Sequence, residues 1–255
     1  MKFLNGKKFL IIGLLNKYSI AYGIAKSMYL QGAKLAFTYK NKKLKNKILK
    51  IIKNFNSDIL LKCNFKNDKE IKKLPKKLKK YNFKINGIIH AVAYLKLKFL
   101  NRSYLDGIVK KSFIKSHLIT SYSFSLIAKV FYKHLKKNST LLTISYLGSK
   151  RILKNYNFMG LAKASLESSV RYLSLALGPK IRVNAISPGP IKTASTYKIK
   201  NFNKLLLKYK NKSSLKKNVT LSEIGDVAVF LSSYLSRGIT GQIIYVDGGF
   251  NNVIN

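Results

Sequence analysis

The chain has 255 residues, 47% of them apolar, and a formal charge of +42, which suits one large α/β domain or two small ones with a substantial core. A single cysteine, Cys63, excludes an internal disulfide and fits a reducing compartment, so we expect a cytoplasmic protein. No stretch approaches the roughly 18 uninterrupted apolar residues of a membrane span.

The basic charge raises the question of a nucleic-acid or anionic-surface partner. Only five of the 50 basic residues are Arg, which leaves 45 Lys, and Asn and Ile are also frequent. The codons of these three types are rich in A and T, so a biased genome would give this composition. The lysines are spread along the chain, and no nucleic-acid-binding module is visible. We therefore expect no dedicated nucleic-acid binding. A degenerate basic protein that binds nucleic acid or an anionic surface stays open as an alternative.

Apolar runs typical of strands alternate with helical stretches along the chain. Several runs are apolar throughout, as in strands that are covered on both faces. This order predicts one Rossmann-like α/β domain over residues 1–255, with a doubly wound, parallel, seven-stranded sheet. Strands are expected at 8–13, 34–39, 58–63, 87–92, 140–146, 181–187 and 242–249, and helices at 20–31, 41–53, 67–80, 107–136, 156–177 and 222–235.

The first strand ends at Gly13, and a turn leads to a helix that opens at Ser19 and Ile20. A glycine lets the backbone approach a ligand, and Ser19 can cap the helix and donate to a phosphate. The helix N-terminus itself favours negative charge. These residues outline a nucleotide phosphate site. The spacing is not G-x-G-x-x-G, so a tight turn with an ordinary serine cap is the alternative.

The fifth strand places Tyr146 at the carboxyl edge of the sheet, and Tyr156 and Lys163 follow on the next helix. Seven steps of ~100° bring these two side chains within ~20° of one helix face. A lysine near a phenol makes the phenol a better acid, and it can also donate to ribose hydroxyls. The group suits hydride transfer from a nicotinamide, with a phenol meeting the charge on a carbonyl oxygen.

The sixth strand is followed by an irregular insertion at 188–220. An insertion beyond the carboxyl end of a strand is a candidate substrate lid. Thr193 and Ser195, near its start, are available to a pyrophosphate.

Three polar residues elsewhere receive structural interpretations. His90 is expected to be a satisfied core or near-site histidine, and Asp247 to hold a turn. The histidines and Cys63 form no pattern of metal ligands, so we expect no metal.

Beyond these residues, the chain is similar to the short-chain dehydrogenase/reductase superfamily. It closely resembles the bacterial NADH-dependent enoyl-acyl-carrier-protein reductases of type II fatty-acid synthesis. The resemblance runs almost end to end. It lies in the segments SIAYGIAKSM, GAKLAFTY, TSYSFSLIAK, LLTISYLG, NYNFMGLAKASLE, RVNAISPGPIKT and VDGGF. Most superfamily reductases place Tyr four positions before Lys, where this chain has Met159. The wider spacing from Tyr156 to Lys163 is typical of the enoyl reductases and disfavours the 3-ketoacyl reductases, which are kept as the alternative enzyme.

The resemblance implies reduction of trans-2-enoyl thioesters on acyl carrier protein, with NADH, by a homotetramer. Tyr146 and Tyr156 would be the active-site tyrosines beside the substrate, Lys163 would hold the nicotinamide ribose, and Leu95 would lie near the substrate carbonyl. The residues implied to bind the cofactor are Gly13, Ser19, Ile20, Lys40, Asn64, Phe65, Val92, Lys163, Ile191, Lys192, Thr193, Ala194 and Ser195.

Three positions depart from the family pattern. Asn64 and Phe65 replace an Asp-Val pair at the adenine, where Asn can still accept from the adenine amine. Lys40 replaces a Gln and could accept a 2′-phosphate, so NADPH stays open as the alternative cofactor. Ala93 replaces a Gly and adds a methyl group near the substrate pocket.

Overall fold

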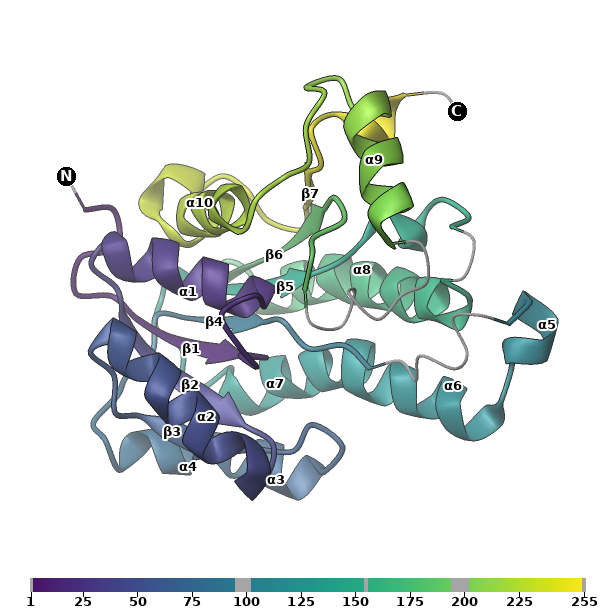
Figure 1. Cartoon of the computed structure of the whole chain (residues 1–255). Helices are drawn as coiled ribbons and strands as arrows, with labels where there is room; N and C mark the ends of the chain where they lie inside the picture. Colours follow the sequence, from purple (N-terminus) through teal and green to yellow (C-terminus); the bar gives the residue numbers. More distant parts are fainter. Residues whose placement is uncertain (1, 95–101, 154–155, 194–201, 254–255) are drawn as a thin grey trace.

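A computed structural model describes residues 2–94, 102–153, 156–193 and 202–253 of the protein. Its centre is a single parallel sheet of seven strands in the order β3-β2-β1-β4-β5-β6-β7 (Figure 1). The predicted doubly wound, Rossmann-like fold is therefore confirmed. The strands are β1 (Lys8–Ile12), β2 (Lys34–Tyr39), β3 (Leu60–Lys62), β4 (Gly87–His90), β5 (Ser139–Ile144), β6 (Ile181–Pro188) and β7 (Ile243–Val246).

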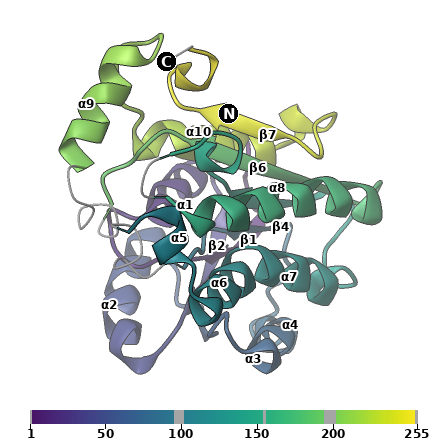
Figure 2. The same cartoon turned by 90° about the vertical axis from the view of Figure 1, so that its right-hand side faces the viewer.

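Helices cover both faces of the sheet, which explains the continuous apolar strands (Figures 1 and 2). The helices are α1 (Ile20–Leu30), α2 (Lys42–Ile52), α3 (Asp68–Lys72), α4 (Leu74–Lys79), α5 (Tyr104–Gly107), α6 (Lys110–His117), α7 (Ser123–Phe131), α8 (Phe158–Leu177), α9 (Phe202–Lys212) and α10 (Leu221–Ser232). In β1, Phe9 and Ile11 pack with α1, α2 and α10, whereas Leu10 and Ile12 pack with α3, α4, α7 and α8. Within the described ranges, no helix is long and apolar enough to cross a membrane.

Two predicted helices are interrupted. The helix expected at 67–80 divides into α3 and α4 because Pro75, in the first turn of α4, has no backbone N–H to continue the ladder. The helix expected at 107–136 divides into α6 and α7 at a π-helical turn, Leu118–Tyr122. There the Ser123 hydroxyl donates to the Ile119 carbonyl at 2.7 Å. Such turns recur at functional sites.

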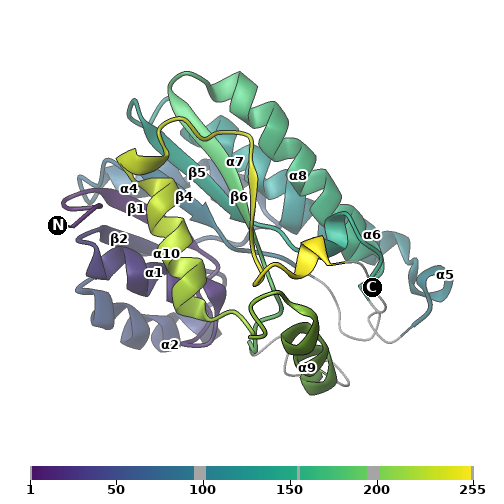
Figure 3. The same cartoon turned by 90° about the horizontal axis from the view of Figure 1, so that it is seen from above.

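The insertion at 188–220 is more regular than predicted, because it contains α9. This helix stands beyond the carboxyl ends of β6 and β7 (Figure 3). Phe202 and Tyr209 are buried, with Leu205 partly buried between them, and this i, i+3, i+7 spacing forms one apolar helix face.

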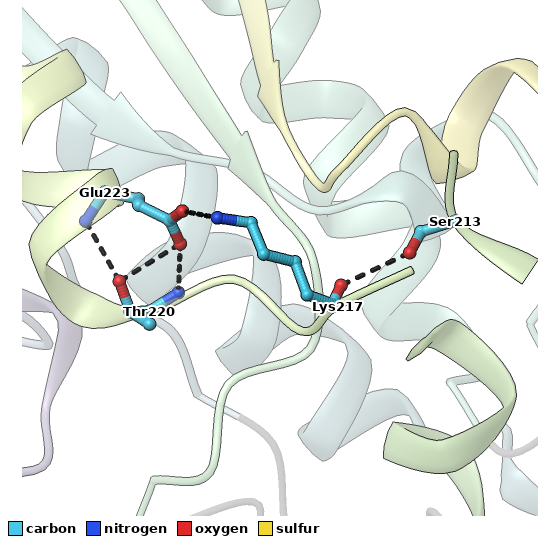
Figure 4. A network of polar contacts seen from close by, with 4 residues as sticks. All are labelled: Ser213, Lys217, Thr220 and Glu223. Carbon is cyan, nitrogen blue, oxygen red and sulfur yellow. Dashed lines mark hydrogen bonds and ion pairs between the residues drawn. The ribbon is translucent and has the colours of Figure 1, made fainter. Parts of the chain in front are cut away.

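The insertion rejoins the sheet layers at a capping box (Figure 4). Thr220 and Glu223 satisfy each other's backbone N–H groups at the start of α10. Lys217 forms an ion pair with Glu223, and its carbonyl accepts from the Ser213 hydroxyl at 3.2 Å. These contacts fix the carboxyl-terminal end of the insertion.

Candidate active site

The two predicted active-site tyrosines meet at the carboxyl edge of the sheet. Tyr146 lies two residues beyond the end of β5, and its ring meets that of Tyr156 edge-on, with centroids 5.1 Å apart. Gly148 makes this arrangement possible, because a Cβ there would lie 2.4 Å from Cδ1 of Tyr156.

Tyr156 does not lie on the helix as predicted. α8 begins at Phe158, and Tyr156 belongs to the turn before it, where its N–H donates to the Leu153 carbonyl at 3.1 Å. Asn157, between them, has a φ of 45°. The angular argument that placed Tyr156 and Lys163 on one helix face was therefore wrong. The turn, rather than the helix, brings Tyr156 to the edge.

Lys163 is buried in α8, with 5% of its surface exposed. Its Nζ donates to the Ile144 carbonyl at 2.6 Å, two residues before Tyr146. Burial lowers the pKa of Lys163 to about 8, and the negative charge of Glu167 opposes that shift. Lys163 therefore sits under the strand end that carries Tyr146.

The phenols are less acidic than the sequence suggested. Burial raises the pKa of Tyr156, and the neighbouring Tyr146 adds to the rise. Burial also raises the pKa of Tyr146. The prediction that Lys163 makes the phenol more acidic was wrong, because removal of the phenolate from water outweighs any such attraction. Both phenols keep their protons at neutral pH.

A second group of predicted residues lies at the switch point between β1 and β4. Gly13 has a φ of 104°, and a Cβ there would lie 2.2 Å from the Ala91 carbonyl oxygen and 3.3 Å from a Val92 methyl. The Ser19 hydroxyl donates to the Asn16 carbonyl at 2.7 Å, so no side chain caps the first turn of α1. A helix N-terminus without a side-chain cap, beside a glycine at the switch point, fits the pyrophosphate of a dinucleotide.

The remaining predicted residues are spread along the same edge. Lys40 is exposed directly after β2, and the Asn64 N–H donates to Glu70 at 2.9 Å. Phe65 is buried with its ring centroid 6.3 Å from that of His90. Ile191 is buried, Lys192 is exposed and Thr193 is half-buried, whereas Leu95, Ala194 and Ser195 lie outside the described residues.

Comparison with known proteins shows which family the chain resembles. Residues 13–251 match the family model described as Enoyl-(Acyl carrier protein) reductase. The NADH-dependent enoyl-acyl-carrier-protein reductase FabI of Buchnera aphidicola subsp. Acyrthosiphon pisum is 52% identical over 98% of this chain and 97% of its own length. FabI of Escherichia coli K12 is 44% identical over 98% and 96%. The crystal structure of the Bacillus cereus enoyl-acyl carrier protein reductase with NADP+ and indole naphthyridinone superposes with a TM-score of 0.96. It is 38% identical and covers all of both chains.

The chain belongs to the enoyl-acyl-carrier-protein reductase family. The predicted oxidoreductase activity and NADH dependence are confirmed, and the main interpretation holds over the ketoacyl reductase and the basic binding protein.

The structural interpretations of His90 and Asp247 in this reductase are confirmed. The His90 ring contacts Thr143 at 3.0 Å and Ser123 at 2.8 Å, and burial lowers its pKa to about 3, so it is neutral. Asp247 accepts from the N–H groups of Gly249 and Asn251 in a turn. Among the described residues, no three His, Cys, Asp or Glu side chains gather as metal ligands.

Sequence reasoning missed one side chain of the reductase that reaches the tyrosine pair. Tyr209, from α9, is 3% exposed, and its hydroxyl lies 3.4 Å from that of Tyr146. Its ring stacks on Phe250 at 3.7 Å. The helical spacing of Phe202, Leu205 and Tyr209 was the available signal.

Proposed function

We propose that reduction takes place where Tyr146, Tyr156 and Lys163 converge, on a trans-2-enoyl thioester carried by acyl carrier protein. The observation that carries this proposal is the edge-on pair of phenols at 5.1 Å, with the Lys163 ammonium anchored just below it. Leu95, implied by the family resemblance, would lie near the substrate carbonyl.

NADH, when bound, supplies a hydride to the β-carbon of the substrate. Gly13, Ser19 and Ile20 would hold its pyrophosphate at the uncapped end of α1. The bond to Ile144 uses one of the three N–H donors of Lys163, which leaves donors for the nicotinamide ribose. By the family resemblance, Lys40, Asn64 and Phe65 would bind on the adenosine side. The residues implied on the nicotinamide side are Val92, Ile191, Lys192, Thr193, Ala194 and Ser195.

Tyr156 serves as the hydrogen-bond donor to the thioester oxygen. Hydride addition at the β-carbon leaves negative charge on that oxygen, and a donor aimed at developing charge lowers the barrier. A proton from solvent, added at the α-carbon, then completes the reduction. Burial keeps the phenol protonated, so the donor is present throughout the neutral pH range. Tyr146 packs against its ring and limits its motion.

A spectrophotometric assay tests this function. We expect NADH absorbance to fall with crotonyl thioester and to stay constant with acetoacetyl thioester, the ketoacyl substrate. Oxidation of NADH by the ketoacyl compound alone would overturn the enoyl assignment. Parallel kinetics with NADPH, on the protein and on Lys40→Gln, measure whether this exposed lysine recruits a 2′-phosphate.

The insertion at 188–220 acts as the substrate lid, because α9 covers the carboxyl edge and Tyr209 contacts Tyr146. Acyl carrier protein would approach over this segment. We place the enzyme in the cytoplasm, which suits its free, buried Cys63.

A homotetramer is the proposed assembly. The α6–α7 layer and α8 expose large apolar side chains, including Ile114, Tyr172 at 77% and Leu175 at 85%, and such faces suit subunit contacts. Light scattering coupled to gel filtration measures the mass. A monomeric mass at micromolar concentration would contradict this assembly.

A further inference from the structure

Glu167 is a buried carboxylate that the family assignment leaves without a role. It lies on α8 one helical turn after Lys163, and only 3% of its surface is exposed. A buried carboxylate is costly unless hydrogen bonds or opposite charge compensate it. Its partners therefore indicate what it does.

Both partners belong to the turn that carries Tyr146. Oε1 of Glu167 accepts from the Ser145 hydroxyl at 2.5 Å and from the Ser149 hydroxyl at 2.6 Å. These distances match O–H···O⁻ bonds to an ionised carboxylate. Ser145 precedes Tyr146 directly and Ser149 follows it by three residues, so one oxygen ties both ends of the turn.

The same region of α8 also holds the end of β5. Lys163 donates to the Ile144 carbonyl at 2.6 Å, and Glu167 binds the next residue, Ser145. Two opposite charges on one helix thus form hydrogen bonds with the two residues that precede Tyr146. No ion pair within 4 Å joins Glu167 to Lys163 in the described part of the chain, so their attraction acts through space.

We propose that Glu167 is a positioning residue of the active site, whose carboxylate fixes the Ser145–Ser149 turn under Tyr146 and keeps the Lys163 ammonium charged for the cofactor. This inference rests on the proposed roles of Tyr146 and Lys163.

The electrostatic surroundings of Lys163 support this role. Burial lowers the pKa of Lys163 to about 8, and Glu167 is the acidic side chain that opposes the fall. His90, on β4, interacts electrostatically with Lys163 but is neutral, and the phenols of Tyr146 and Tyr156 are protonated. Loss of the Glu167 charge would therefore bring the Lys163 pKa into the neutral range.

Two substitutions separate the charge from the hydrogen bonds. Glu167→Gln keeps an acceptor for the serines but removes the charge. Glu167→Asp keeps the charge but shortens its reach to the serines. Asp226→Asn, at an exposed position on α10, is the control for loss of an acidic charge.

The readouts are NADH affinity by calorimetry as a function of pH, kcat with crotonyl thioester, and thermal unfolding. For Glu167→Gln we expect the alkaline loss of NADH affinity to move down by about one pH unit, the low end for an opposite charge nearby. For Glu167→Asp we expect this alkaline limb of the affinity–pH profile to stay at the parental pH, and kcat to fall several-fold. Asp226→Asn should leave both unchanged.

A folded Glu167→Gln protein that loses NADH affinity at the same pH as the parental protein would overturn the proposal. So would Gln and Asp variants with the same alkaline limb and the same kcat. If the Gln variant fails to fold, the Asp variant alone still tests the proposal. A shift in its alkaline limb, or an unchanged kcat, would overturn the proposal. Lys163→Ala distinguishes this result from failure of the site itself. If that variant keeps full NADH affinity, the ribose role of Lys163 is wrong. If it loses affinity while Glu167→Gln keeps the parental limb, only the role of Glu167 is wrong.

Discussion

Lys163 and the lysines of α9 carry the same ammonium group at the same edge of the sheet, in opposite surroundings. Lys163 is 5% exposed and bonded to a strand end, whereas Lys204 and Lys208 are exposed on α9. Burial makes one charge costly and sensitive to each neighbour, whereas water and salt screen the others. Single substitutions should therefore have large effects inside the site, and only combined substitutions should matter on the proposed lid.

Tyr156→Phe should give the largest effect inside the site. It removes the proposed donor, which would act mainly in the transition state, so we expect kcat to fall about 10²–10⁴-fold, with little change in NADH affinity. Steady-state kinetics and calorimetry measure the two quantities. Tyr81→Phe, at an exposed position after α4, is the control and should leave both unchanged. A Tyr156→Phe enzyme with parental turnover would remove the phenol from the mechanism.

Lys163→Ala should weaken NADH binding, because it removes the proposed ribose donor. In the parental protein, NADH binding should also weaken when Lys163 loses its proton. Burial lowers the Lys163 pKa from its ordinary 10.5 to about 8, so the charged form is present below pH 8 and is lost as the pH rises. We therefore expect NADH affinity to decline above about pH 8, and calorimetry across pH 6–10 checks this. Lys129→Ala, at an exposed position on α7, should retain the parental profile.

The sheet and much of this site could be predicted from the sequence, because the signals are local. Apolar runs at 8–13 and 87–92 predict strands covered on both faces, and the end of the fifth strand places Tyr146 at the carboxyl edge. Gly13, after the first strand, likewise marks the switch point. Each inference needed only periodicity and the rule that ligands bind at the carboxyl edge of parallel strands.

The contacts that tune the site could not be predicted in this way, because they join distant residues. Tyr209 lies 63 positions after Tyr146, and frequent Lys and Asn obscured its helix. The need for Gly148 is visible only once the Tyr156 ring is placed beside it. The phenol pKa was predicted in the wrong direction, because the cost of burial depends on packing that sequence spacing does not contain.

Tyr209 belongs to α9 but contacts Tyr146 in the buried site, so Tyr209→Phe should have an intermediate effect. The substitution removes one long hydroxyl contact to Tyr146 but keeps the stacking on Phe250. A neutral hydrogen bond contributes about 0.5–1.5 kcal/mol to stability, so we expect the temperature of unfolding to fall by a few degrees at most. We expect kcat/KM to fall less than about tenfold. Tyr234→Phe, at a 67% exposed position, is the control. A loss as large as that of Tyr156→Phe would make Tyr209 part of the chemistry.

The smallest effect per residue is expected on the basic lid. The chain has a formal net charge of +42. The partner implied by the family resemblance, acyl carrier protein, is acidic. Long-range attraction should speed their encounter, and salt should weaken it as the Debye length falls to ~8 Å near 0.15 M. We therefore expect kcat/KM for the carrier-bound substrate to fall steeply with salt, while the value for a small thioester changes little.

Two quadruple variants test whether the position of these lysines matters. The lid set replaces Lys198, Lys200, Lys204 and Lys208 with Gln, the first two of which lie outside the described residues. The control set replaces exposed Lys72, Lys73, Lys76 and Lys79 on the α3–α4 side of the molecule (Figure 1). Each set lowers the formal charge from +42 to +38, since 42 − 4 = 38. If the lid guides the carrier, the lid set should flatten the salt dependence more than the control set, because attraction grows as charges approach. Equal salt slopes in the lid set and the parental protein would leave codon bias as the better account of the basic lid. Equal flattening by both sets would assign the effect to net charge alone.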